Sequence, residues 1–302
     1  MSEHHPRIRV LAKNGHVLIR EGLCACFHMR RPHSEAAPGV LRSLDTYRRA
    51  VGAHALSWYA DADAEWQRLD ASGWEYTYRN MVEEPWGSLY LTADSGSEAR
   101  FRIEYLGREL KLPSLAHTPE ETCVVSFWLP TEFLEQGPQV VREFLLELAA
   151  PLPFNSGNAG LAFNCQLDLA GVAREVRQYC FRYPGMDVLL PSITSMRIGT
   201  RVRSPSWLTF LGQPVLGELG GVSGLRSRLH TPGTTVQELE GDRAVVTLGP
   251  WPEAGDTEQG KDLPAYRELA RVLEPWTLWG EGEYVLGMNP DDARRWERRF
   301  LD

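Results

Sequence analysis

The order of strand-like and helix-like segments constrains the fold of this chain more than any other feature. Segments with the alternating pattern or residue content of strands occur at 89–91, 101–105, 123–128, 157–163, 235–239 and 244–248. The first three would form a meander between about 88 and 129. Strands therefore come in runs separated by single helices, without regular βαβ alternation. This order predicts an α+β fold, mainly antiparallel sheet with several interleaved helices.

The first thirty residues predict a β-hairpin. Residues 7–11 and 17–20 have strand character, and Lys13-Asn14-Gly15 lies between them. Asn and Gly tolerate the positive φ angles that a tight hairpin turn requires. The run from Leu23 to Met29 either continues the second strand or adds another.

Helical periodicity accounts for most of the remaining chain. A helix is expected from Pro138 to the prolines that follow 150, because proline cannot donate to the helical hydrogen-bond ladder. Others are expected at about 41–51, 168–182, 225–229, 264–274 and from 291 onward.

Two early segments depend on how turn residues are interpreted. Pro32 and Pro38 predict a loop before the helix at 41–51. The acidic segment 61–65 could open a helix, since carboxylates favour the first helical turn, and Gly73 would interrupt it.

Composition limits the class of protein. The 302 residues are 43% hydrophobic, which is enough apolar surface to exclude disorder as the main state. No apolar stretch approaches the roughly 18–20 residues that cross a bilayer, and the start MSEHHPRIRV has no apolar core of a signal peptide. The expected organisation is one α+β domain over 1–302, or two closely packed subdomains meeting near 130–155. The loop 113–119 is the nearest segment to a linker.

Cysteine usage indicates a reducing compartment. The five cysteines are odd in number and scattered, and a chain of this size needs no disulfide framework. We therefore expect a cytoplasmic protein.

The sharpest metal-like cluster is Cys24, Cys26, His28 and His33. In a strand, residues 24, 26 and 28 share one face and could converge on zinc. Structural zinc sites use CxxC knuckles, however, and CxC differs from that spacing. A strand face of small buried cysteines beside a histidine is the simpler interpretation, and no metal or cofactor is predicted.

Other catalytic patterns are missing from the sequence. The serine in Gly220-Gly221-Val222-Ser223-Gly224 has the wrong glycine spacing for a GxSxG nucleophile elbow, so a glycine-rich turn is expected. GxGxxG after a strand, GxxxxGK[ST] and HExxH do not occur. Carboxylates cluster at Asp61, Asp63 and Glu65 and again in 253–262, where they could hold a divalent cation or act as acid and base. Such clusters are more often solvated loops or helix starts. We predict no catalytic residue.

Charge is distributed unevenly along the chain. The formal net charge is −8, which argues against a general nucleic-acid binder. Residues 237–292 hold 13 acidic and four basic residues, giving −9, whereas residues 1–50 hold nine basic and four acidic residues, giving +5. The acidic span is either a solvated surface or a docking face for a basic partner.

Several segments, in order, resemble the TsiV-like group of type VI secretion immunity proteins. The likeness depends on framework motifs at 156–163, 206–212, 219–221, 225–226, 249–256 and 264–266. Asn158 departs from it, because an aromatic residue is expected there. The motif glycines Gly157, Gly160, Gly220 and Gly221 are expected to permit positive φ or close packing.

The resemblance implies a cytoplasmic immunity protein, not an enzyme, that binds and neutralises a cognate effector toxin by stoichiometric inhibition. Some toxins paired with the family resemble nucleases, so an acidic immunity surface could occupy a basic nucleic-acid-binding cleft. No direct contact of this protein with nucleic acid or membrane is expected. The acidic span then suggests the toxin-binding residues Glu253, Asp256, Glu258 and Asp262. The alternatives are a metal-dependent hydrolase that uses the acidic loop, and an adaptor of the secretion apparatus.

Overall fold

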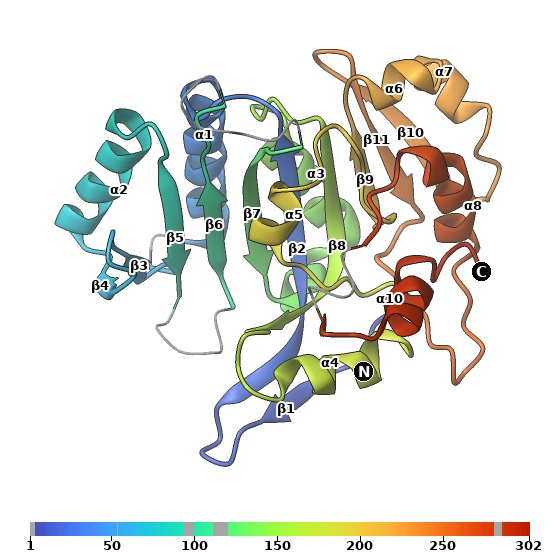
Figure 1. Ribbon diagram of the computed structural model, residues 1–302, viewed down its shortest axis with the longest axis horizontal. Helices are drawn as coiled ribbons and strands as arrows, with labels where there is room; N and C mark the ends of the chain where they lie inside the picture. Colours follow the sequence, from blue (N-terminus) through green and yellow to red (C-terminus); the bar gives the residue numbers. More distant parts are fainter. Residues whose placement is uncertain (1–3, 53, 94–99, 111–119, 281–285) are drawn as a thin grey trace.

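An antiparallel sheet of eleven strands forms the centre of the protein in the computed structural model (Figure 1). The structure describes residues 4–52, 54–93, 100–110, 120–280 and 286–302. Ten strands follow the order β10-β11-β9-β8-β2-β7-β6-β5-β3-β4, and β1 pairs with β2 outside this path. The strands are β1 Arg9–Leu11, β2 Val17–Met29, β3 Trp58–Ala60, β4 Trp66–Arg68, β5 Ser88–Thr92, β6 Arg102–Leu106, β7 Cys123–Leu129, β8 Ser156–Cys165, β9 Leu208–Leu211, β10 Thr234–Leu239 and β11 Arg243–Leu248.

Helices cover both faces of the sheet and extend past its ends. Figure 1 shows α2 at one end of the molecule and α8 at the other. Two short 3-10 turns, η1 and η2, lie at Thr131–Gln136 and Glu274–Trp276. The α-helices are α1 His33–Val51, α2 Ala71–Glu83, α3 Pro138–Ala149, α4 Val172–Cys180, α5 Pro191–Ser195, α6 Val215–Glu218, α7 Gly221–Arg226, α8 Pro264–Leu273 and α10 Pro290–Glu297. The α+β prediction is confirmed.

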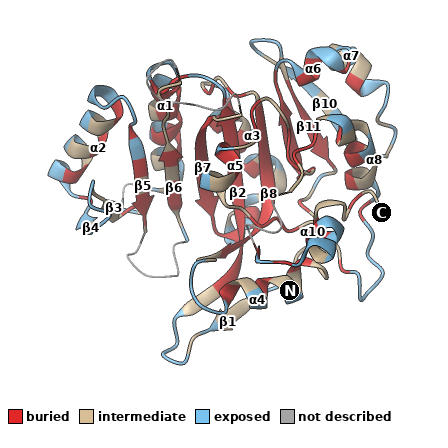
Figure 2. Cartoon of the chain, in the orientation of Figure 1, coloured by how far each residue is buried: buried red, intermediate tan, exposed pale blue. Residues whose placement is uncertain are grey.

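The two faces of the central sheet differ in chemistry. Odd-numbered residues of β2, β5, β6, β7 and β8 pack with α1 and α3 into the main hydrophobic core. Even-numbered residues of the same strands form what we call the polar face, which includes Cys26, His28, Arg102, Ser126 and Asn158. Segments from the second half of the chain cover this face, so both sides of the strands are buried (Figure 2).

Most strand and helix predictions are confirmed, including the first hairpin, the meander β5-β6-β7 and the helix after Pro138. The run from Leu23 to Met29 continues β2. The helix expected at 168–182 is shorter, because Gly171 has φ +87° immediately before α4. Both halves of the chain contribute strands to one sheet, while the subdomain boundary near 130–155 stays a prediction. The turn at 94–97 lies outside the described residues, as does the loop at 113–119.

The loop predicted around Pro38 is wrong. Helix α1 begins at His33 and runs through this proline. A proline in a helix costs about 3 kcal/mol, but Ala36, Ala37 and Val40 around it are buried against the sheet. The free energy gained by burying these side chains offsets the loss of the helical hydrogen bond that the proline cannot make.

The helix considered at 61–65 is also wrong. These residues form the turn between β3 and β4, where the Asp61 carboxylate accepts the backbone N–H groups of Asp63 at 3.1 Å and Glu65 at 2.9 Å. Aspartate side chains compete with the helical ladder in this way. Gly73 does not interrupt a helix but lies inside α2, where an added Cβ would come 2.8 Å from the ring of Tyr59.

The motif glycines have the roles expected of them. Gly220 and Gly221 have φ values of +85° and +70° at the turn that begins α7. Gly160 and Gly157 instead permit close packing in β8, and a Cβ on Gly157 would lie 2.5 Å from the ring of Phe27.

We predict that Gly157→Ala destabilises the protein by about 1–3 kcal/mol, the usual cost of overpacking a core. The Phe27 ring cannot move aside, because its centroid lies 5.7 Å from that of Phe154 and 5.0 Å from that of Phe210. Gly22→Ala on β2 is the matched control, since its nearest atoms are 3.3–3.4 Å away. Urea unfolding measures both, and equal losses would contradict the packing argument.

Among the described residues, none of the helices has the length and apolar character needed to cross a membrane.

Candidate partner-binding surfaces

Arg182 organises the centre of the acidic segment 253–262. Its Nε and Nη2 donate to the two carboxylate oxygens of Asp256 at 3.1 and 3.0 Å. Its Nη1 also pairs with Glu258 at 2.5 Å. These hydrogen bonds lower the pKa of Asp256. Asp256 is buried, while the Glu258 side chain is 65% exposed, so the first anchors the segment and the second faces solvent.

The other two predicted residues have separate partners. Glu253 pairs with His4 at 2.5 Å, and the His4 ring stacks on Trp251. Asp262 pairs with Arg267 at 2.8 Å, and this hydrogen bond lowers the pKa of its carboxyl, yet its side chain is 64% exposed. The four sequence-predicted residues thus share one segment but do not converge on one point.

Spatial pairing reduces the charge excess that was counted along the sequence. Arg182 and Arg298, which pair with acidic residues of 237–292, both lie outside that span. By contrast, Glu238, Glu240 and Asp242 are exposed on the β10–β11 hairpin, and no ion pair to them is found in the described part of the chain. Sequence analysis predicted both strands of this hairpin and counted its three carboxylates in the acidic span. It did not single them out as a binding surface, although their alternate positions were a signal.

The metal-like cluster that was considered from the sequence does not assemble. Cys24, Cys26 and His28 do share the polar face, and the Cys26 Sγ lies 3.8 Å from the His28 Nε2. His33 is elsewhere, bonded to the Tyr105 hydroxyl at 2.9 Å and to a backbone carbonyl. Over the described ranges, no group of three or more His, Cys, Asp or Glu residues could hold a metal ion. The structure favours the interpretation of a buried strand face.

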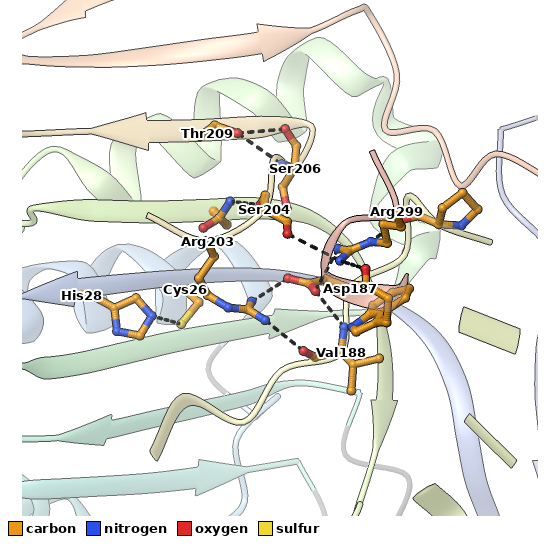
Figure 3. Close-up of polar contacts among 12 residues, drawn as sticks. Cys26, His28, Asp187, Val188, Arg203, Ser204, Ser206, Thr209 and Arg299 are labelled. Carbon is orange, nitrogen blue, oxygen red and sulfur yellow. Dashed lines mark hydrogen bonds and ion pairs between the residues drawn. The ribbon is translucent and has the colours of Figure 1, made fainter. Parts of the chain in front are cut away.

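A charge network crosses the polar face, as Figure 3 shows. The Asp187 carboxylate accepts from Arg203 Nη1 at 2.6 Å and from Arg299 Nη2 at 3.4 Å. All three side chains are only 8% exposed. Burial lowers the pKa of Arg299 to about 10. One carboxylate therefore holds two buried guanidinium groups and ties the C-terminal segment to the sheet.

The polar face also carries polar atoms that have no partner. In the part of the chain that the structure describes, six buried side-chain nitrogen or oxygen atoms lack a hydrogen-bond partner. Five of them lie on strands of this face: His28 Nδ1, Thr92 Oγ1, Arg102 Nε, Trp128 Nε1 and Ser156 Oγ. The sixth, Thr234 Oγ1, lies on the edge strand β10. Arg102 Nε is nevertheless within ion-pair distance of a Glu104 oxygen, at 3.1 Å. Such atoms are rare in folded proteins and call for an explanation.

A cavity of about 490 Å³ opens on the polar face between β5–β7 and the segment leading into α5. Arg102, Glu104 and Trp128 line it from the sheet. Leu189, Leu190 and other apolar side chains complete the lining, which also includes Asp61 and Asp168. Sequence analysis gave no indication of this cavity.

Comparison with known families identifies the class of this protein. It is that of the immunity proteins of type VI secretion. The model of one such family, TsiV, described as type VI immunity for VRR-NUC, matches residues 39–300. The chain belongs to the TsiV family and is a type VI secretion immunity protein. The resemblance carried by the framework motifs is confirmed.

A solved structure supports the fold. The Pseudomonas aeruginosa T6SS protein PA0821 superposes with a TM-score of 0.80 at 20% sequence identity, covering 98% of this chain and 88% of that chain. At this identity the likeness concerns the fold. A search of the curated proteins gives no match.

Proposed function

We propose that this protein binds a VRR-NUC nuclease effector in the cytoplasm and neutralises it by stoichiometric inhibition, without catalysis. The observation that carries the proposal is the family match over residues 39–300. A nuclease must contact phosphates through Lys and Arg side chains, so its substrate cleft is basic. An acidic immunity protein is electrostatically complementary to such a cleft.

We further propose that the toxin contacts the acidic segment formed by Glu253, Asp256, Glu258 and Asp262. Asp256 acts indirectly, since it is buried on Arg182 and holds the segment in place. Glu258 and Asp262 are the exposed carboxylates that would meet a basic partner.

Co-expression of this protein with its cognate VRR-NUC effector tests the proposed function. Cells should survive the toxin only when the immunity protein is present, and the purified proteins should form a one-to-one complex by calorimetry. Failure to protect or to bind would refute the proposal. Loss of toxin activity at an amount of immunity protein far below one equivalent would instead indicate catalysis.

We predict that Glu258→Lys combined with Asp262→Lys lowers toxin affinity about tenfold in low salt, because reversed charges repel a basic surface. The loss should shrink as salt screens the interaction. Glu143→Lys combined with Glu147→Lys is the matched control, since both residues are exposed on α3, which packs on the other face of the sheet. Equal affinities for the two double variants at low salt would place the contact elsewhere.

A further inference from the structure

The cavity on the polar face has the size of an ordinary ligand pocket, about 490 Å³. We call it the sheet pocket, lined from the sheet by Arg102, Glu104 and Trp128. The guanidinium of Arg102 lies 4.6 Å from the Trp128 ring centroid and 3.1 Å from a Glu104 oxygen. This floor is rigid, because Ser126 also donates to Glu104 at 3.2 Å.

Trp128 supplies the floor with a donor that the protein leaves unused. The residue is 2% exposed, and its indole Nε1 has no hydrogen-bond partner. This nitrogen has less than 1 Å² of accessible surface, so an acceptor oxygen in the pocket does not reach it as the side chains lie. The charged and apolar groups of the lining therefore decide which ligand fits.

The charges of the lining select for a positive ligand. Asp61, Glu104 and Asp168 contribute three carboxylates, against the single guanidinium of Arg102. Asp168 is exposed, and the described residues provide it with no ion-pair partner. An anion entering the pocket would be repelled, whereas a cationic head group could approach this carboxylate.

Apolar side chains form the remaining walls of the pocket. The side chains of Leu106, Val124, Leu189 and Leu190 line the pocket alongside the charged groups. A ligand that fits therefore combines an aliphatic stem with a cationic end. The side chain of an Arg or Lys residue has both.

We infer that the sheet pocket receives a basic side chain from an extended segment of the nuclease toxin. This inference rests on the proposed function, because a nuclease is the partner that would present such segments. The pocket is a second contact, on strands β5–β7, separate from the acidic segment near α8 (Figure 1).

Closing the pocket tests this inference. Ser192 is exposed in α5 and lines the pocket, so Ser192→Trp should occupy it and lower toxin affinity about tenfold or more by calorimetry. Ser34→Trp, on the exposed side of α1, is the matched control and should bind like the wild type.

Two further variants separate the contributions. Asp168→Lys should weaken binding by reversing the charge that meets the basic side chain, whereas Glu143→Lys on α3 should not. Trp128→Phe removes only the inaccessible donor and should leave toxin binding unchanged, with melting temperature measured to show that the fold persists.

The outcomes are distinct. If the wild type fails to bind the toxin, the proposed function itself fails. If the wild type binds and Ser192→Trp and Asp168→Lys bind within about twofold of it, the pocket lies outside the interface and the inference is wrong. A small molecule found by native mass spectrometry on the wild type but not on Ser192→Trp, with toxin affinity unchanged, would also overturn it.

Discussion

Asp187→Ala is expected to destabilise the protein by about 3–5 kcal/mol, because it removes the carboxylate that two buried guanidinium groups share. The carboxylate accepts from Arg203 at 2.6 Å and Arg299 at 3.4 Å, and it also accepts the backbone N–H of Val188 at 2.9 Å. Neither arginine can reach water without displacing the segments that bury it, since each side chain is only 8% exposed.

Equilibrium urea unfolding of Asp187→Ala and of the exposed control Asp168→Ala measures this cost. The control should change stability by no more than about 0.5 kcal/mol. Limited proteolysis adds a local readout, because Arg299 follows α10 and its release should expose the C-terminal segment first. A loss below about 1 kcal/mol for Asp187→Ala would mean that the network relaxes into solvent, contrary to the burial described.

The fold was largely predictable where local signals agree with the tertiary structure. The Asn14-Gly15 turn between the first two strands, the alternation at 101–105 and the proline at the start of α3 each act over a few residues, and each gave the correct element. Prediction was wrong where two local effects compete. At Pro38 a buried stripe outweighs the helix-breaking residue, and at Asp61 a side-chain turn outweighs helical capping.

The site was far less predictable, because pairing in space does not follow spacing in sequence. Counting charges over 237–292 located an acidic region but could not show that Arg182 joins Asp256 and Glu258. Asp187 and Arg299 meet across 112 positions. The alternation at 24, 26 and 28 in β2 was a local sign of the polar face of the sheet, and it supported a buried strand face over the zinc site that was also considered.

At both candidate contact sites an arginine pairs with one carboxylate, while another carboxylate nearby is exposed to solvent. Arg182 fixes Asp256 and leaves Glu258 exposed, and Arg102 pairs with Glu104 while Asp168 stays exposed at the same pocket. In both places a buried or partly buried pair sets the backbone, and a neighbouring carboxylate faces solvent. Glu258 itself pairs with Arg182 at 2.5 Å, so a basic partner would compete with that ion pair. At the pocket it would meet a carboxylate outside the Arg102–Glu104 pair.

Acid should destabilise this protein through His28. Burial, together with the positive charge of Arg203, lowers the pKa of His28 to about 3. In the unfolded chain a histidine has a pKa of about 6.5. Between these values the unfolded state binds one more proton than the folded state, so the stabilisation is present above the unfolded pKa and declines as pH falls. From pH 6.5 to pH 4 this residue should account for a loss of about 3 kcal/mol.

His28→Gln removes that proton and should flatten the pH dependence of the unfolding free energy between pH 7 and pH 4. Exposed His16→Gln, in the first hairpin, should retain the wild-type dependence and is the control. The test compares the slopes of unfolding free energy against pH. A loss of stability in His28→Gln that is the same at every pH therefore does not affect the result. Parallel curves for all three proteins would show that His28 can be protonated in the folded state, by a proton reaching the Nδ1 that lacks a partner. The polar face would then be accessible to water, and its unpaired atoms would need no ligand to explain them.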